Sequence, residues 1–119
     1  WVIVRYIVTE SVVGDRVLCG AIDSQTSERA TVDWRRDGAA MVDDWRPHRL
    51  PAEVEAGLVA LADRLGLQYG AADLILTPDQ RYVFLEVNPV GEFEWLEQHA
   101  GLPIASAIAD VLVGRHRRA

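Results

Sequence analysis

Three oxygen-bearing side chains in the second half of the sequence have the types and spacing of a divalent-metal site. Asp73 and Glu86 carry carboxylates, and Asn88 follows two positions after Glu86. Carboxylate and amide oxygens are hard ligands, and Mg²⁺ accepts a few of them and completes its octahedron with water and phosphate. The chemistry that such a site supports is the neutralisation and positioning of phosphate groups.

A hairpin is expected to bring these side chains together. The segments 69–77 and 81–88 read as two strands around a turn at 78–80, because Pro followed by Asp is common in turns. Folding the segment about the midpoint between residues 79 and 80 places Asp73 opposite Glu86, with Cβ atoms about 5 Å apart. Two like charges in this position destabilise a sheet unless a cation offsets them.

The alternation of side chains along the two strands supports this register. One face is wholly apolar, and a slip of one residue would bury the acids. The same register pairs Ile75 with Phe84 and puts Tyr82 and Phe84 on the face of the carboxylates. An ordinary pair of surface acids is the alternative interpretation, and the spacing alone leaves both open. The expected core face consists of Leu74, Leu76, Val83, Leu85 and Val87.

The remaining elements predict an α+β fold with an antiparallel sheet. Apolar residues recur at helical spacing over 52–65 and again over 103–113. Strands over 1–8 and 16–22 flank a tight turn at Gly14–Asp15, a pair that tolerates positive φ. We expect a single domain over residues 1–119, with both helices on one face of the sheet and the other face open.

Composition and charge narrow the classes of function. Half of the 119 residues are apolar, and the formal net charge is −6, which argues against a nucleic-acid partner. No apolar run is long enough to span a membrane, so no membrane partner is expected. Cys19 is the only cysteine, which predicts a buried thiol and a cytoplasmic protein. All twelve basic residues are arginine.

Several segments resemble the C-terminal part of the ATP-grasp ligases. The resemblance is closest to the peptide maturases that build macrocycles of the microviridin, or graspetide, type. It covers nearly the whole chain, and its centre is the Asp, Glu-x-Asn pattern described above. The matching segments are 12–15 (Val-Val-Gly-Asp), 22–25 (Ile-Asp-Ser-Gln), 33–35 (Asp-Trp-Arg), 69–74 (Tyr-Gly-Ala-Ala-Asp-Leu), 77–79 (Thr-Pro-Asp), 83–91 (Val-Phe-Leu-Glu-Val-Asn-Pro-Val-Gly) and 101–105 (Gly-Leu-Pro-Ile-Ala).

The resemblance implies an enzyme with ATP and Mg²⁺ as cofactors. In this family Asp73, Glu86 and Asn88 would hold two Mg²⁺ ions that bridge the ATP phosphates. The ligase would phosphorylate a side-chain carboxylate of a ribosomal precursor peptide, and a hydroxyl or amine of the same peptide would then close an ester or an amide. Arg35 would supply a catalytic cation for the phosphates, although a surface arginine is an equal alternative. Pairing of two copies into a homodimer is left open.

The sequence also departs from the family. Relatives carry an arginine shortly before the Val-Val-Gly turn, whereas residues 8–11 here are Val-Thr-Glu-Ser. The phosphate-contacting lysines and the adenine-hinge strand of the family are absent too. We therefore expect residues 1–119 to be a partial ATP-grasp domain whose N-terminal portion is missing. Two alternatives remain: a non-catalytic remnant that binds a peptide or a partner, and a ligase for other substrates.

Two further groups of residues have two interpretations each. Trp34, Trp45 and Trp95 are expected to pack as partly buried aromatics, with a peptide-binding surface as the alternative. Glu92, Glu94 and Glu97 suit the start of a short helix over 92–99, where the helix dipole favours negative charge. Orientation of a substrate amine is the second interpretation of these acids.

Overall fold

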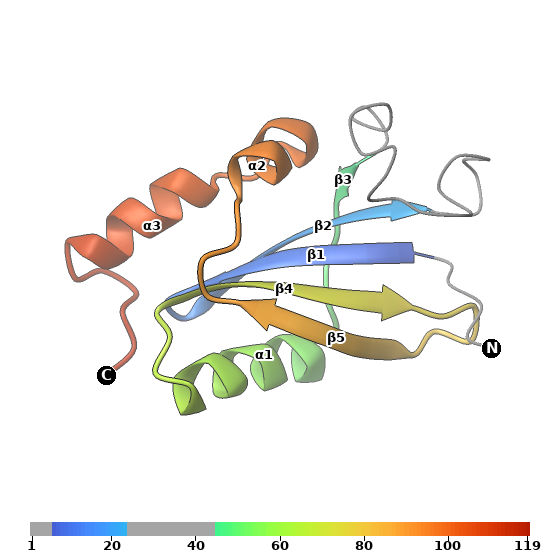
Figure 1. Ribbon diagram of the computed structural model, residues 1–119, viewed down its shortest axis with the longest axis horizontal. Coiled ribbons are helices and arrows are strands. Elements are labelled where there is room, and N and C mark those ends of the chain that lie inside the picture. The colour runs from blue at the N-terminus through green and yellow to red at the C-terminus, as the bar shows by residue number, and fades with distance from the viewer. Residues whose placement is uncertain (1–5, 24–44) are drawn as a thin grey trace.

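The fold is built around one antiparallel sheet, which Figure 1 shows with its helices. The computed structural model describes residues 6–23 and 45–119. The sheet has the strand order β3-β2-β1-β4-β5, so β1 is its central strand. The strands are β1 (Tyr6–Val13), β2 (Arg16–Asp23), β3 (Arg46–Pro47), β4 (Tyr69–Leu76) and β5 (Tyr82–Asn88), and the helices are α1 (Ala52–Arg64), α2 (Glu94–Ala100) and α3 (Ile104–Leu112).

The first hairpin forms at the predicted turn. β1 and β2 pair in register from Tyr6 with Asp23 to Val13 with Arg16. Gly14 adopts a φ of 59° in the turn, a value that glycine reaches without the steric cost of a side chain. The hairpin is central to the sheet because β1 also pairs with β4 along its whole length.

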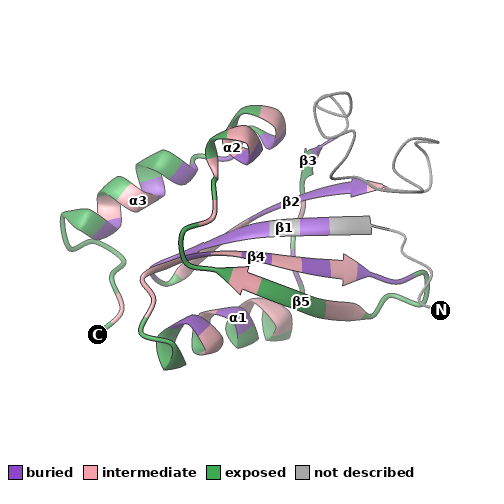
Figure 2. Ribbon diagram, in the orientation of Figure 1, coloured by how far each residue is buried: buried purple, intermediate pink, exposed green. Residues whose placement is uncertain are grey.

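Two separate apolar clusters cover the two faces of the sheet. On one face Leu58 and Ala62 of α1 pack against sheet residues that include Val8 and Leu74. On the other face, over β1 and β2, the apolar residues of α2 and α3 pack against Val13 and Ile22. The buried central strand β1 contrasts with the largely exposed edge strand β5 in Figure 2.

The antiparallel α+β class is confirmed, but the placement of both long helices on one face is wrong. α1 and α3 lie on opposite faces, because neighbouring residues of a strand point to opposite sides. Val12 belongs to the cluster under α1, whereas the adjacent Val13 belongs to the cluster under α3. Both sides of the β1–β2 hairpin are therefore apolar at this end and both need a helix. The part of the second face beyond α2 and α3 carries Asp73.

The β4–β5 hairpin differs from the predicted one between its turn and Glu86. Asp73 pairs with Glu86 as expected, but Leu74 pairs with Phe84, which leaves Leu85 as an extra residue in a β-bulge. Ile75 therefore pairs with Val83 rather than with Phe84. The predictions that placed Tyr82 and Phe84 beside the carboxylates are wrong: Tyr82 packs into the cluster on the α1 face. Because of the bulge, residues 82–84 of β5 point to the opposite faces of the sheet from those predicted.

No helix among residues 6–23 and 45–119 is long and apolar enough to cross a membrane. Cys19 is a free, buried cysteine, as predicted. The predicted contributions of Trp34 and Arg35 lie outside the described residues.

Candidate functional site

The candidate site is formed by residues 71–73 of β4 and 86–88 of β5, where the predicted register holds. Asp73 and Glu86 are direct cross-strand partners, and Ala71 pairs with Asn88 two residues further along the strands. Residues 71, 73 and 75 of β4 alternate with the buried residues that face α1. Asp73 and Glu86 thus lie on the face opposite α1, with Asp73 half-buried and Glu86 exposed.

The third predicted ligand is held by the loop that follows β5. Asn88 is exposed, and its Oδ1 accepts a hydrogen bond from the backbone N–H of Val90 at 3.0 Å. This bond fixes which end of the amide is the oxygen and how it is turned. A carbonyl oxygen has two lone pairs, so one remains for a second partner.

The donor chemistry of these three residues suits Mg²⁺, which prefers oxygen ligands and keeps several waters or phosphate oxygens of its own. Among the described residues no group of three or more His, Cys, Asp or Glu side chains could hold a metal ion. A cation at this end of the sheet would therefore rely on two carboxylates, the Asn88 amide oxygen and oxygens from outside the chain.

Glu10 is a notable residue that lies outside the Asp, Glu-x-Asn pattern. It is fully buried on β1, between Cys19 and Ala72, and neither carboxylate oxygen has a hydrogen-bond partner among the residues that the structure describes. Burial and, to a lesser extent, the charge of Asp73 together raise the pKa of Glu10 to about 9. A signal was available, because Glu10 falls between Val8 and Val12 on an otherwise apolar face.

His48 and Tyr82 form a polar contact on the α1 side of the sheet, the side on which Glu10 is buried. His48 Nε2 and Tyr82 Oη lie 2.7 Å apart, and burial lowers the pKa of His48. Burial also raises the pKa of the Cys19 thiol, with Glu10 contributing. An inert, neutral thiol follows, since the thiolate is the reactive form.

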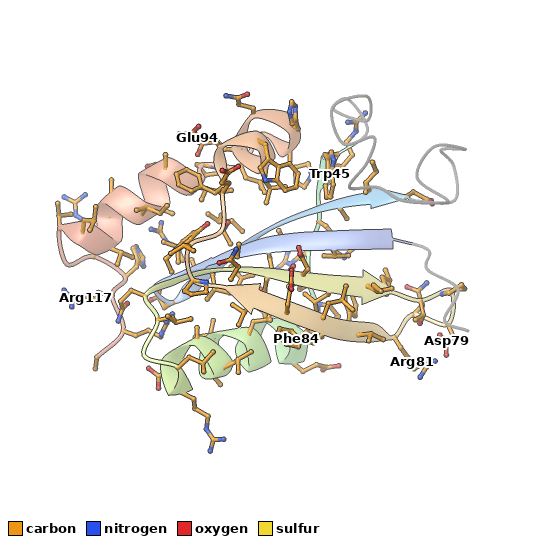
Figure 3. The ribbon with its side chains drawn as sticks, viewed as in Figure 1. Trp45, Asp79, Arg81, Phe84, Glu94 and Arg117 are labelled. Carbon is orange, nitrogen blue, oxygen red and sulfur yellow. The ribbon has the colours of Figure 1, made fainter. Side chains whose placement is uncertain are left out.

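The turn of the β4–β5 hairpin is well ordered by side chains but lies far from the carboxylates. Asp79 accepts hydrogen bonds from the Thr77 hydroxyl and, at 2.7 Å, from Arg81 Nε. Both contacts lower the pKa of Asp79, the Thr77 hydroxyl most. Figure 3 shows Asp79 and Arg81 at the end of the sheet away from α3. This carboxylate belongs to the turn.

Comparison with known proteins identifies solved structures of the same architecture. Neither a protein-family model nor a curated protein matches the chain. The RiPP-associated ATP-grasp ligase of Chryseobacterium gregarium, in complex with ADP and a leader and core peptide, matches 98% of the chain with a TM-score of 0.86 and 36% identity. The chain covers 36% of that protein.

Two macrocyclases of Microcystis aeruginosa MRC are also similar. MdnC, bound with the precursor peptide MdnA, matches 94% of the chain with a TM-score of 0.74 and 39% identity. MdnB matches 96% of the chain with a TM-score of 0.75 and 36% identity. The chain covers 31% of MdnC and 39% of MdnB, and so spans about a third of the length of these solved relatives. The resemblance to ATP-grasp ligases of the peptide-macrocyclising type is confirmed.

Proposed function

We propose that this chain is the metal-binding part of an ATP- and Mg²⁺-dependent ATP-grasp ligase that crosslinks a ribosomal precursor peptide. The observation that carries the proposal is the direct pairing of Asp73 with Glu86 on the sheet face opposite α1. The similar ligase of Chryseobacterium gregarium was solved with ADP and with leader and core peptides. MdnC was solved with a precursor peptide. Both support ATP and a peptide as the ligands.

In this proposal Asp73, Glu86 and Asn88 hold the Mg²⁺. When bound, Mg²⁺ would neutralise phosphate charge and so favour conversion of a peptide carboxylate to an acyl phosphate. The chain supplies positioning: the strand pairing fixes the two carboxylates relative to each other, and the Val90 N–H orients the Asn88 oxygen. Arg35, outside the described residues, would supply a cation for the phosphates. A hydroxyl or an amine of the peptide would then displace phosphate from the acyl phosphate and give an ester or an amide.

The proposal includes a longer protein. The chain spans about a third of its solved relatives and contains no lysine. We assign the ATP-contacting lysines and the adenine-binding strand to a portion N-terminal to Trp1 in the complete ligase. A cytoplasmic location and a peptide partner belong to the same proposal.

The test uses the complete ligase with its precursor peptide, ATP and Mg²⁺. Asp73→Asn and Glu86→Gln each remove one charge while keeping the size of the side chain. We expect each to lower Mg²⁺-dependent ADP release and peptide dehydration by about 100-fold or more, because each removes charge stabilisation at the phosphates. ADP release is followed by a coupled assay, and loss of water from the peptide by mass spectrometry.

The matched control is Glu53→Gln, which removes an exposed carboxylate from the first turn of α1 on the other face of the sheet. It should leave both activities unchanged. Wild-type activity in the Asp73 and Glu86 variants would reject the metal assignment. A complete chain with no ATP-dependent activity toward any peptide would favour the non-catalytic, peptide-binding remnant instead.

A further inference from the structure

A large hollow lies in the loop that joins β5 to α2, directly after the candidate metal ligands. Its volume is about 580 Å³, which is enough for two or three side chains of a peptide. It begins two residues after Asn88 and extends onto the first turns of α2. The lining residues are Val90, Gly91, Glu92, Phe93, Glu94, Trp95 and Gln98.

The loop that forms the hollow is held rigidly. The Tyr69 hydroxyl donates a hydrogen bond to the Gly91 carbonyl at 2.6 Å, and Trp95 Nε1 donates one to the Glu92 carbonyl at 3.1 Å. Gly91 packs so closely on Ala71 that a Cβ at this position would collide with the Cβ of Ala71. A preformed hollow loses little entropy when a ligand binds.

Two aromatic side chains line the hollow, and each packs against a further aromatic ring. Phe93 packs edge-on against Tyr69 with ring centroids 6.1 Å apart, and Trp95 packs edge-on against Trp45 at 5.1 Å. Figure 3 shows Trp45 beside α2. Val90 is 84% exposed. These groups offer an apolar surface that is already fixed in shape.

Among the described residues, the charged side chains that line the hollow are acidic. Glu92 and Glu94 are exposed, and none of the lining residues that the structure describes is cationic. Glu97 has a different task, because its Oε2 accepts the Ala105 backbone N–H at 2.7 Å and so caps the start of α3. Figure 3 places Glu94 where the loop enters α2. The complementary ligand is a cationic side chain with an apolar neighbour.

The hollow is also close to the carboxylate pair. Gly91 lies on Ala71, and Ala71 is two residues from Asp73 on the same face of β4. Two residues of strand span about 7 Å. A peptide side chain seated in the hollow would therefore hold its neighbouring residues next to Asp73 and Glu86.

We propose that this hollow is the subsite that selects the substrate peptide, by binding a lysine side chain between Glu92 and Glu94 and an adjacent apolar residue against Phe93. The proposal rests on the proposed function, because it takes the peptide as the substrate of the site formed by Asp73 and Glu86. It adds a specificity determinant for that substrate: a lysine beside an apolar residue.

The test measures binding without chemistry, in the complete ligase and in the absence of ATP and Mg²⁺. The probes are acetyl-lysyl-phenylalanine amide and its norleucyl analogue, which has the same apolar stem and no charge. The reporter is the indole N–H resonance of Trp95, identified by its loss in Trp95→Phe. We expect the resonance to shift with the lysyl probe and its dissociation constant to be about three- to tenfold lower than that of the norleucyl probe.

The double variant Glu92→Gln, Glu94→Gln should abolish this preference by weakening the lysyl probe alone, which isolates the charge interaction. The matched control Glu53→Gln should keep the preference. Equal binding of the two probes to the wild type, or a preference that survives in the double variant, would overturn the proposal. So would the absence of any shift at Trp95.

Failure of this proposal is distinguishable from failure of the proposed function. Loss of activity in Asp73→Asn tests the function, whereas the preference of the wild type for the lysyl over the norleucyl probe, measured without metal or nucleotide, tests the subsite. A ligase that loses activity in Asp73→Asn but binds both probes equally would retain the function and reject the subsite.

Discussion

At the residue scale, Glu10 has the largest expected influence on how stability varies with pH. Its carboxyl is fully buried, without a hydrogen-bond partner in the described part of the chain. Its folded-state pKa of about 9 lies above the ordinary value of 4.5. The folded state therefore holds the proton more tightly than the unfolded chain. The stability that this proton provides is complete below about pH 4.5 and is lost as pH rises toward 9.

We predict that Glu10→Gln removes this pH dependence. One pKa unit corresponds to about 1.4 kcal/mol, so the wild type should lose up to about 4 kcal/mol more than the variant between pH 6 and pH 9. Urea unfolding at the two pH values measures the difference. Parallel pH profiles for wild type and Glu10→Gln would contradict the prediction, and Glu53→Gln should follow the wild type.

His48 acts in the opposite direction at lower pH. Burial lowers its pKa from 6.5, so the stability that its neutral form provides is present above about pH 6.5 and is lost on acidification. The comparison of Glu10→Gln with wild type is therefore best made above pH 6, where His48 contributes equally to both proteins.

At the element scale, local sequence predicts one part of the β4–β5 hairpin register and not the other. The pairing of Asp73 with Glu86 could be predicted, because alternation and the turn chemistry at residues 78–80 act locally. The bulge at Leu85 could not: Tyr82 is drawn to the α1 face, where it packs on the core and approaches His48. That contact joins residues distant in the sequence, so the alternation of apolar residues along the strand does not predict it.

The loop after β5 gives a prediction at the same scale. Gly91→Ala should lower stability by about 1–3 kcal/mol, because its new methyl group meets Ala71 and the packed loop must shift. The shift should also weaken the bond from Val90 to Asn88. Chemical unfolding measures the stability, and Mg²⁺-dependent ADP release in the complete ligase measures the effect on the site.

Gly57→Ala is the matched control for this substitution. Gly57 lies in α1, and a Cβ there would meet nothing within 4 Å. Alanine should raise the free energy of unfolding by about 0.5–1 kcal/mol through its better helix propensity. A Gly91→Ala protein as stable as Gly57→Ala would show that the loop is not packed as described.

At the scale of the whole molecule, two apolar clusters on opposite faces replace the one-sided core expected from the sequence. Helical periodicity gives the apolar side of a helix but not the sheet face on which it packs. Val12 and Val13 are both apolar, so the strand pattern leaves that choice open as well. Only the long-range pairing of β1 with β2 and β4 determines that α3 crosses to the second face.

The C-terminal residues close the molecule by tying three distant segments together. The Gln68 side chain donates to the Arg118 carbonyl at 3.0 Å and accepts from its backbone N–H at 3.1 Å. The Gln68 carbonyl in turn accepts the Gly14 N–H of the first turn at 2.8 Å. The Arg118 side chain, only 9% exposed, reaches the carbonyl of Leu67.

We predict that Gln68→Ala loosens this closure and lowers stability by about 1–2 kcal/mol, since each of its two side-chain hydrogen bonds contributes roughly 1 kcal/mol. Amide hydrogen exchange should accelerate at Arg118 and at Gly14, whose N–H depends on the position of residue 68. Gln98→Ala, an exposed glutamine on α2, is the matched control and should change stability by less than about 0.5 kcal/mol. Unchanged exchange at Arg118 in Gln68→Ala would mean that the C-terminal residues are held by other contacts.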